Sequence, residues 1–315
     1  MRIGVIGTGN WGKNLVKNFS TLGVLAGIAD GIEANRTAAL AINPNIEVFN
    51  NHTALLTKGY DAVAIATPAH THFSIAKEAI EAGCDVFVEK PMTLDPKESE
   101  ALVALAKHHD QILMVGHLLL YQPAIAHIKK SLDRKELGQI YTMHQRRSKL
   151  GRARSVENVL WSFGVHDVAV LLYLSGQEPS DIQAVGHCGL QPNVEDDTFL
   201  HLTFPDGSKA HLHNSWLWPI VERGLIIIGE KGMLVYDELE QTVIMTRKTI
   251  DSNLQNVELG EEIICQGSGQ PLKIELEHFI KCCKERTQPN SCGQSGLDVV
   301  KVLDQAETIL KQARK

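Results

Sequence analysis

The first 120 residues alternate between short apolar runs and amphipathic segments. Each short apolar run predicts a buried strand, and apolar residues three and four positions apart, as at Leu15, Val16 and Phe19, predict the helices between strands. The predicted strands are RIGVIG, VLAGIAD, IEVFN, DAVAIATP, DVFVEKP and QILMVGH. Strands that alternate with helices favour parallel pairing, so residues 1–120 are expected to form a doubly wound α/β sheet of the Rossmann type.

The pattern changes after residue 120. Two helical segments, QPAIAHIKKSLDRKELG and VLWSFGVHDVAVLLYLSG, precede several strand-like runs without helices between them, and two amphipathic helices close the chain. The strand-like runs are DIQAVGHCG, DDTFLHLTF, SKAHLHNSW, RGLIIIG, GMLVYDE and TVIMTRK, with hairpin turns predicted at PDGS and GEKG. Residues 121–315 are therefore expected to form a second, α+β domain with a mostly antiparallel sheet.

The composition is that of a soluble globular chain. Of 315 residues, 43% are hydrophobic and 22% are charged, which excludes a disordered or fibrous protein. A formal net charge of −6 provides no broad cationic surface for nucleic acid or anionic lipid. Small-molecule partners are favoured, and no nucleic-acid or membrane partner is expected.

The six cysteines are scattered, and none belongs to a CxxC motif. This spacing predicts reduced thiols, with neither a disulfide framework nor a metal site. The segment MRIGVIGTGNWG enters a predicted strand directly, without the apolar core of a secretion signal, and no apolar run reaches membrane-spanning length. The resulting expectation is a cytoplasmic protein.

A glycine motif follows the first predicted strand. Gly7, Gly9 and Gly12 form GxGxxG directly before a helix, where backbone N–H groups can approach a pyrophosphate. Asp30 ends the next strand, 23 positions after Gly7 (30 − 7), where its carboxylate can bind ribose hydroxyls and repel a 2′-phosphate. This combination predicts NAD, with NADP less favoured although Arg36 lies nearby. The alternative is a tight packing turn with Asp30 as a helix N-cap.

The segment ATPAHTH ends another predicted strand, at the edge of the sheet where ligands bind. Thr67 and Pro68 are candidates to border the cofactor. His72 is a further candidate, and a solvated loop or helix start is the alternative for both His70 and His72. The expected cofactor contacts are Gly7, Gly9, Asn10, Trp11, Gly12, Asp30, Thr67, Pro68, His72, Glu89 and Lys90.

The segment VFVEKPMT places an ionisable pair and a proline where a buried strand ends. Lys90 can donate to a substrate hydroxyl there and stabilise the alkoxide that develops as hydride leaves. Glu89 can hold Lys90 in position, and Pro91 can fix the turn, in a trans or a cis form. For the tripeptide alone, a charged strand end before a proline turn is the simpler alternative.

These motifs occur in an order and spacing that resemble the Gfo/Idh/MocA family of NAD(P)-dependent oxidoreductases. The resemblance rests on GTGNWG, ATPAHTH, EAGCDVFVEKPMT, MVGHLLLYQPAI, WSFGVHDV and SWLWPIVERGLIIIGEKGMLVYDE, which extend over most of the chain. It implies a Rossmann domain, a substrate domain with an open, mostly antiparallel sheet, and a homo-oligomer, either dimer or tetramer. The family's catalytic lysine and histidine match Lys90 and His166.

The resemblance implies that His166 is the general base. Imidazole can take the hydroxyl proton near neutral pH while Lys90 stabilises the alkoxide. Without the match, a histidine on an apolar helix is more simply a core residue. Many members carry an aspartate four positions earlier, but here the position holds Ser162, which cannot act as a carboxylate. The adjacent Asp167 points elsewhere if the segment is helical.

The segment RRSKLGRARSVENVLWSFGVHD resembles a narrower branch of the family, the UDP-N-acetylhexosamine 3-dehydrogenases of bacterial surface-glycan pathways. Its cations, Arg147, Lys149, Arg152 and Arg154, suit a diphosphate, and a solvated basic loop is the alternative. Tyr121 can line the sugar pocket or pack between domains, whereas Glu222 and Arg223 are weaker candidates at a sheet edge. The expected substrate contacts are Lys90, Tyr121, Arg147, Lys149, Arg154, Asn158, Trp161 and His166.

The expected reaction is oxidation of the C3 hydroxyl of UDP-N-acetylglucosamine to a 3-keto sugar, with NAD as the hydride acceptor. A dehydrogenase of a free sugar or polyol would use the same lysine and histidine without needing the basic segment. A non-catalytic sensor of NAD or sugar is the alternative of another class; the missing aspartate favours it, and the presence of Lys90 and His166 disfavours it. Reduction of a biliverdin-like tetrapyrrole fits the sequence less well.

Overall fold

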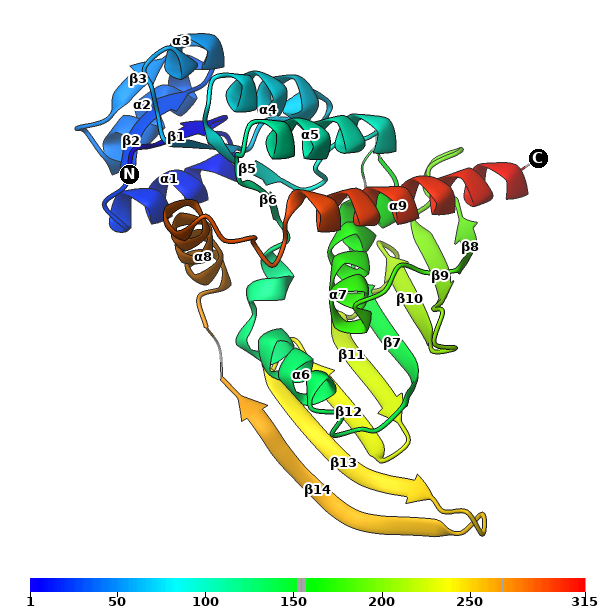
Figure 1. Ribbon diagram of the computed structural model, residues 1–315. Helices are drawn as coiled ribbons and strands as arrows, with labels where there is room; N and C mark the ends of the chain where they lie inside the picture. Colours follow the sequence, from blue (N-terminus) through cyan, green and yellow to red (C-terminus); the bar gives the residue numbers. More distant parts are fainter. Residues whose placement is uncertain (152–153, 155–156, 268, 315) are drawn as a thin grey trace. The chain divides into compact units, whose positions relative to one another are not determined.

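The computed structural model describes residues 1–151, 154, 157–267 and 269–314. The chain divides into two compact units (Figure 1). The first unit comprises Met1–Leu118 and Gln270–Val300, and the second comprises Leu119–Gly269 and Lys301–Lys315. Each unit contains one β-sheet with its own buried core.

The first unit is built on a six-stranded parallel sheet in the order β3-β2-β1-β4-β5-β6. The strands are β1 (Ile3–Ile6), β2 (Leu25–Ala29), β3 (Glu47–Phe49), β4 (Ala62–Ile65), β5 (Asp85–Glu89) and β6 (Leu113–Gly116). The strand order reverses between β1 and β4, and ligands of such sheets bind outside the carboxyl ends of the strands at this switch point. The predicted Rossmann architecture is confirmed.

Helices cover the parallel sheet and bury their apolar faces against it (Figure 1). α1 buries Leu15, Val16 and Phe19, the residues whose spacing predicts it. α5 begins after Asp95, whose carboxylate accepts a hydrogen bond from the Lys97 backbone N–H at 2.8 Å. The helices are α1 (Gly12–Thr21), α2 (Glu33–Ile42), α3 (His52–Leu56), α4 (His72–Glu81) and α5 (Pro96–His108), with the 3₁₀ turn η1 (Ala69–Thr71) before α4.

Part of the segment expected in the second domain, residues 121–315, belongs instead to the first unit. Helix α8 lies along α1, and its Phe279 ring contacts the Phe87 ring of β5 with centroids 5.7 Å apart. After α8, Arg286 forms an ion pair with Asp85 at 2.7 Å. The segment consists of α8 (Pro271–Glu285) and the beginning of α9 (Gly293–Ala313). The boundary differs because the apolar face of an amphipathic helix shows that the helix packs, but not against which sheet.

The second unit is built on an eight-stranded sheet in the order β14-β13-β12-β11-β7-β10-β9-β8. β10 runs parallel to β7, and the other neighbouring strands are antiparallel. The strands are β7 (Ile140–Ser148), β8 (Asp181–His187), β9 (Asp197–Thr203), β10 (Lys209–Ser215), β11 (Glu222–Gly229), β12 (Gly232–Asp237), β13 (Thr242–Ile250) and β14 (Asn256–Gln266). The PDGS and GEKG turns join β9 to β10 and β11 to β12, which confirms both predicted hairpins.

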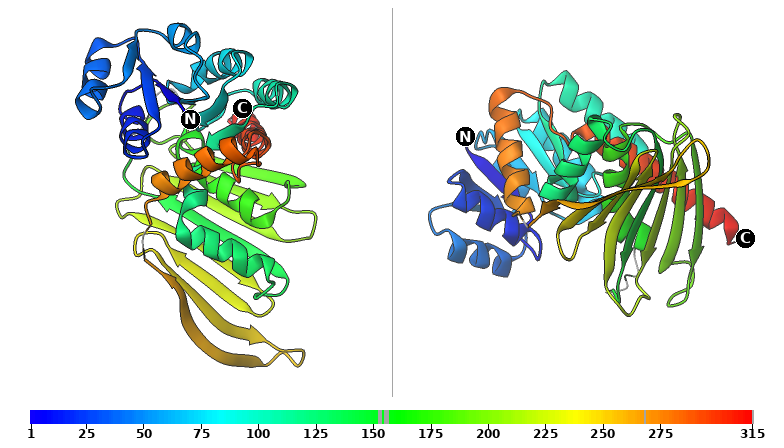
Figure 2. Two further views of the ribbon diagram at one scale, coloured as in Figure 1. Left: turned by 60° about the vertical axis from the view of Figure 1, so that its left-hand side comes forward. Right: turned by 90° about the horizontal axis from the view of Figure 1, so that it is seen from below.

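Helices α6 and α7 lie on one face of the eight-stranded sheet (Figure 2). Side chains alternate between the two faces, so Leu200 and Leu202 of β9 are buried while Phe199 is exposed and His201 is half-buried. Among the described residues, no helix of this unit covers the opposite face, which is called the outer face below. The elements are η2 (Leu118–Tyr121), α6 (Pro123–Asp133), the π-helical turn η3 (Leu160–Gly164) and α7 (Val165–Ser175).

Within the part of the chain that the structure describes, no helix is long and apolar enough to cross a membrane. The same residues contain no group of three or more His, Cys, Asp or Glu side chains placed to hold a metal ion. The six cysteines are free thiols, and Cys282 and Cys283 of α8 are buried. Burial raises the pKa of both thiols, so they stay protonated at neutral pH.

Candidate active site

The glycine loop lies between the carboxyl end of β1 and the start of α1. Gly7 has a φ of +85°, and a Cβ atom there would meet the Thr67 backbone nitrogen at 2.8 Å. A Cβ atom on Gly12 would meet the Gly7 carbonyl oxygen at 1.9 Å, so both positions require glycine for the turn itself. At Gly9 the nearest atom to a Cβ, Asn35 Nδ2, would be 3.9 Å away. The space at Gly9 fits a pyrophosphate that approaches the backbone.

Asp30 joins the end of β2 to the glycine loop. Its Oδ2 accepts hydrogen bonds from Thr8 N at 2.7 Å, Thr8 Oγ1 at 3.2 Å and Asn35 Nδ2 at 3.1 Å. Its Oδ1 accepts from Ile32 N at 2.8 Å, and Ile32 rather than Asp30 is the N-cap residue of α2. The Arg36 guanidinium donates to the Asp30 carbonyl oxygen at 2.8 Å. These donors orient the carboxylate beside the loop, where an acid can bind the ribose hydroxyls of NAD.

His72 connects the turn after β4 to the turn after β5. It is the first residue of α4, as the helix-start alternative expected, but it is buried rather than solvated, whereas His70 is exposed. Its Nδ1 lies 2.8 Å from the Pro91 carbonyl oxygen, and its Nε2 lies 2.9 Å from the Thr67 carbonyl oxygen. Burial lowers the pKa of His72, so a neutral ring donates to one of these oxygens at a time. His72 therefore shapes the turns that carry Thr67, Pro68 and the lysine.

Lys90 directly follows β5, and the Lys90–Pro91 peptide bond is cis. Lys90 is half-buried, whereas Glu89 is buried and accepts a hydrogen bond from the indole Nε1 of Trp11. Burial raises the pKa of Glu89 to about 7, although the Trp11 hydrogen bond and the Lys90 charge oppose the shift. Trp11 and its neighbour Asn10 are exposed in the glycine loop. Glu89 therefore connects the glycine loop, through Trp11, with the turn after β5 that carries Lys90.

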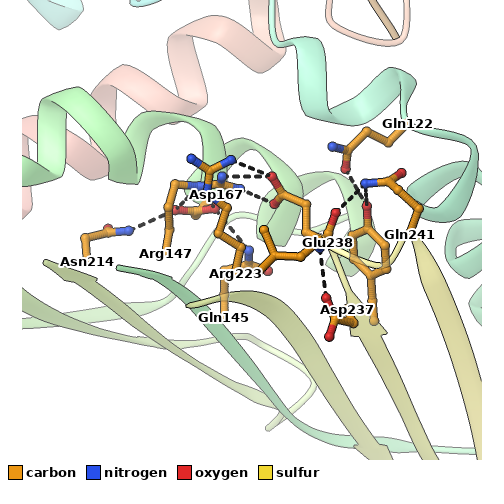
Figure 3. Close-up of polar contacts among 11 residues, drawn as sticks. Gln122, Gln145, Arg147, Asp167, Asn214, Arg223, Asp237, Glu238 and Gln241 are labelled. Atoms are coloured by element: carbon orange, nitrogen blue, oxygen red, sulfur yellow. Dashed lines mark hydrogen bonds and ion pairs between the residues drawn. The ribbon is translucent and has the colours of Figure 1, made fainter. Parts of the chain in front are cut away.

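His166 lies in the first turn of α7 and is half-buried. The next residue, Asp167, is fully buried and accepts hydrogen bonds from Gln145 Nε2 at 3.0 Å and Asn214 Nδ2 at 2.8 Å (Figure 3). Burial raises the pKa of Asp167, while the Arg147 charge opposes the shift. Because neighbouring residues of a helix point in different directions, these contacts direct Asp167 into the sheet rather than toward the His166 ring.

Ser162 occupies the position at which many members of the resembled family carry an aspartate. It is buried in the π-helical turn η3, and its backbone N–H donates to the Asn158 carbonyl oxygen at 3.1 Å. Hydrogen bonds of a π-helix span five residues instead of four. Because this turn lies directly before α7, Ser162 and His166 do not belong to one uninterrupted α-helix.

Arg147 is buried in β7, so the alternative of a solvated basic loop does not hold for it. Its Nε donates to Asp167 Oδ1 at 2.9 Å, and its terminal nitrogens donate to Glu238 at 3.0 and 2.6 Å (Figure 3). Arg223 lies 3.5 Å from Glu238, which completes a cluster of two arginines and two carboxylates, the β7–α7 ion cluster. Burial alone would lower the pKa of Arg147, but the two carboxylates outweigh burial and raise it. Internal partners therefore occupy this guanidinium.

The other cations of the basic segment are more accessible. Lys149 is half-buried, with its Nζ 5.7 Å from the centre of the Phe163 ring. Arg154 is exposed and pairs with Glu157 at 2.5 Å. An exposed ion pair of this kind contributes little free energy, so other anions can compete for Arg154. Arg152 lies outside the described residues. Lys149 and Arg154 are thus better placed than Arg147 to meet a charged ligand.

Asn158, Trp161 and Tyr121 are buried. Asn158 Nδ2 donates to Glu195 at 3.0 Å, and Trp161 Nε1 donates to Glu307 at 3.3 Å. These contacts hold the segment before α7 inside the second unit. They account for the burial of Asn158 and Trp161 without a ligand.

Glu222 and Arg223 lie in β11, which is inside the sheet between β12 and β7. The expectation of a sheet edge is therefore wrong, because strand order depends on pairing between distant segments. Glu222 pairs with Arg146 of β7 at 2.5 Å. Arg223 belongs to the β7–α7 ion cluster.

Sequence reasoning missed three residues around Asp167, namely Gln145, Asn214 and Glu238. A signal exists for Gln145, because it follows the buried Met143 by two positions and so shares its face of β7. A polar residue on the inward face of a strand needs a buried polar partner. No comparable local pattern marks Asn214 or Glu238.

The first unit fits NAD. The glycine loop has space at Gly9, the Asp30 carboxylate is oriented beside that loop, and Lys90 and Thr67 follow strands that end at the same edge of the sheet. Gly7, Gly9, Gly12 and Asp30 would hold the pyrophosphate and ribose. Among the described residues, those expected to bind the cofactor belong to the first unit, and His166 belongs to the second.

Two family models match the chain. Residues 1–117 match the oxidoreductase family with an NAD-binding Rossmann fold, and residues 125–235 match the GFO/IDH/MocA C-terminal domain. The two matches together include all six strands of the parallel sheet and the central strands of the second sheet.

Similar proteins include the UDP-N-acetylglucosamine 3-dehydrogenase of Acidithiobacillus ferrooxidans, 33% identical over 281 residues that cover 89% of this chain and 88% of that protein. A solved structure of that name, GnnA from the same organism, aligns with a TM-score of 0.88 and 27% identity over 99% of this chain and 98% of the other. The scyllo-inositol 2-dehydrogenase (NAD(+)) of Bacillus subtilis is 26% identical over 92% of this chain and 88% of that protein. The chain belongs to the Gfo/Idh/MocA family of NAD-binding oxidoreductases.

Proposed function

We propose that this enzyme oxidises the C3 hydroxyl of UDP-N-acetylglucosamine, or of a related UDP-hexosamine, to the 3-keto sugar. The observation that carries the proposal is the similarity along 89% of the chain to a relative named for this reaction, together with the match of Lys90 and His166 to the family's catalytic pair. Bacterial surface-glycan or lipid A biosynthesis would use such a product.

The proposed chemistry assigns a separate role to each reacting group. NAD, when bound, supplies the acceptor for the two electrons and the hydrogen that leave C3. The Lys90 ammonium donates to the hydroxyl oxygen and stabilises its negative charge as the C–H bond breaks. A nitrogen of the His166 ring takes the hydroxyl proton, and the remaining electron pair forms the C=O bond.

The proposed cofactor contacts are the expected ones in the glycine loop, at Asp30, and in the turns after β4 and β5. Thr67 and Pro68 border the cofactor, while His72 acts by holding both turns through their backbone carbonyl groups. Glu89 contributes to the cofactor site indirectly, by accepting a hydrogen bond from Trp11 and by lying beside the charge of Lys90. Each of these groups lies in the first unit.

For the substrate, we assign the diphosphate to Lys149 and Arg154. Arg147 is left out of the direct contacts because Asp167 and Glu238 occupy its guanidinium. Tyr121 remains proposed as a residue of the sugar pocket, and Asn158 and Trp161 as supports of the segment that carries the cations.

A dehydrogenase of a free sugar or polyol is the second candidate. The similarity to an inositol dehydrogenase over 92% of the chain favours it. Such a substrate carries no diphosphate, so removing Lys149 and Arg154 would leave its binding unchanged. A sensor without catalysis would bind NAD or sugar but would not transfer hydride.

We further propose a cytoplasmic homo-oligomer, dimer or tetramer, that associates through the outer face of the eight-stranded sheet. Apolar residues that lie opposite one another on β14, β13, β12 and β11 form a row on this face: Ile263, Ile244, Val235 and Ile226. The row continues with His144, His211 and His201 on β7, β10 and β9, and at the far end of the sheet Val185 and Phe199 are 64% and 44% exposed. An apolar surface of this extent favours burial against a second copy.

The proposed reaction is tested with purified protein, NAD and UDP-N-acetylglucosamine. The expected result is NADH absorbance together with loss of two mass units from the nucleotide sugar. Lys90→Ala and His166→Ala should each lower kcat by about 10²- to 10⁴-fold. Oxidation of inositol or a free sugar instead of the nucleotide sugar would favour the second candidate, and NAD binding without oxidation of any of them would favour the sensor.

A further inference from the structure

Glu275 is a buried carboxyl group for which the proposed chemistry has no role. It lies on α8, is 1% exposed, and its Oε1 has no hydrogen-bond partner among the described residues. Burial of an ionised carboxylate without a partner is costly, so such a group is expected to keep its proton. The surroundings of Glu275 indicate what this neutral carboxyl group does.

The contact between α8 and β5 brings Glu275 near Glu89. Phe279 follows Glu275 by four positions and so lies on the same face of α8. Its ring contacts that of Phe87, with centroids 5.7 Å apart, and Glu89 follows Phe87 by two positions on the same face of β5. Burial, and then the charge of Glu89, raise the pKa of Glu275 well above its usual range.

The remaining neighbours offer Glu89 few other donors. Trp11 Nε1 donates to Glu89 Oε1, and on the β6 side a Cβ atom on Gly116 would lie 3.0 Å from Glu89 Oε2. His117 after β6 is buried, and burial followed by the Lys90 charge lowers its pKa to about 3, so it stays neutral. Lys90 provides positive charge beside Glu89.

Other charged groups on the packed elements face away from this pair. α1 presents Leu15, Val16 and Phe19 to the interior. On α8, Lys273 and Glu277 pair with each other at the surface, as do Lys281 and Glu285. At the opposite end of β5, Asp85 pairs with Arg286.

We propose that Glu275 is a positioning residue for hydride transfer, acting as a neutral carboxylic acid whose O–H donates to Glu89. Glu89 and Glu275 then share one proton, held mainly on Glu275, and the negative charge stays on Glu89 next to Lys90. Glu275 thereby fixes the carboxylate that connects the glycine loop with the catalytic lysine. The inference rests on the proposed function in taking Lys90 as the residue that stabilises the alkoxide.

The protonation state is tested by infrared spectroscopy of the full chain at about pH 8, where ordinary carboxyl groups are ionised. Wild type should show the C=O band of a buried neutral carboxyl that is lost in both Glu275→Gln and Glu275→Leu. The matched control is Glu277→Gln, which changes an exposed carboxylate on the same helix and should keep the band. If the band is missing in wild type, or persists in Glu275→Gln, the proposal is wrong. This measurement needs no sugar, so a failure of the proposed substrate would not affect it.

Kinetics test the positioning role. Glu275→Gln keeps an N–H donor for Glu89 and should retain kcat within about threefold, whereas Glu275→Leu should lose about 10- to 100-fold with KM for the sugar unchanged. Equal losses in the two variants would overturn the donor role and leave a packing role only.

A thermal titration gives a third readout. A carboxyl group whose pKa is higher in the folded state stabilises the protein below its unfolded pKa, and that contribution is lost as pH rises through the folded pKa. The melting temperature of wild type should therefore fall relative to that of Glu275→Gln as the pH rises above about 5, where an unfolded carboxyl group ionises. If the difference in melting temperature between wild type and Glu275→Gln does not change with pH, Glu275 does not titrate in this range and the proposal is contradicted.

Discussion

Arg147 Nε lies 2.9 Å from Asp167 Oδ1, and both side chains are almost completely buried. Arg147 belongs to β7 and Asp167 to the first turn of α7, directly after His166. The ion pair therefore anchors the helix start that carries the proposed general base. The terminal nitrogens of the Arg147 guanidinium donate to Glu238. Removal of either carboxylate would therefore leave part of the positive charge of Arg147 buried without a partner.

The β7–α7 ion cluster should be sensitive to the loss of one charge. Asp167→Asn removes a carboxylate from Arg147, and we expect a loss of about 3–5 kcal/mol in the free energy of unfolding, measured by urea denaturation. Asp304→Asn changes an exposed carboxylate on α9 and should stay within about 0.5 kcal/mol of wild type. Equal midpoints for Asp167→Asn and wild type would show that the cluster does not stabilise the fold.

The orientation of Asp30 should determine the choice between NAD and NADP. Asp30→Ser removes the carboxylate that would bind the ribose hydroxyls and repel a 2′-phosphate, while Arg36 stays nearby. We expect kcat/KM with NAD to fall by about 10- to 100-fold and the value with NADP to rise. Steady-state kinetics with both cofactors measure this change. An unchanged ratio of the two values would contradict the role of Asp30.

Ser162 should not replace the missing aspartate. It is buried in the π-helical turn, and its hydroxyl cannot supply the charge of a carboxylate. Ser162→Ala should therefore keep kcat within about threefold of wild type, against a loss of about 10²-fold or more for His166→Ala. The pH profile of kcat should also keep its shape in Ser162→Ala. A loss as large as that of His166→Ala would instead make Ser162 part of the proton path.

The apolar row on the outer face should control association. Ile226 is 37% exposed and lies opposite Val235. Ile226→Asp places a charge in the proposed interface and should convert the oligomer to monomers in sedimentation experiments. Leu239→Asp, in the hairpin between β12 and β13, is the matched control and should leave the oligomer intact. A wild-type protein that sediments as a monomer would contradict the interface.

Most of the fold could be predicted because buried strands and amphipathic helices have distinct patterns. The glycine loop and Asp30 followed from local spacing, and the structure places them together. β14 was missed because it is an edge strand whose residues are mostly exposed, with Gly260 interrupting its alternation. The position of α8 was also wrong, since its apolar face does not identify the sheet that it covers.

The site was predicted less completely than the fold. The run of cations was expected to meet a diphosphate together, but Arg147 is the last inward-facing residue of β7, whereas Lys149 and Arg154 follow that strand. Glu238, the partner of Arg147, lies 91 residues away in the sequence, so no local pattern connects these two residues. Glu275 was also missed, because it is one polar position within the apolar face of α8 and its partner lies far away in the sequence.

Transfer of the C3 hydrogen tests the central proposal most directly. UDP-N-acetylglucosamine carrying deuterium at C3 is incubated with the enzyme and NAD, and both products are analysed by mass spectrometry. We expect the deuterium to appear in the reduced cofactor and to be lost from the sugar, and we expect Lys90→Ala and His166→Ala to abolish the transfer. Deuterium that stays on the sugar while NADH forms would contradict oxidation at C3.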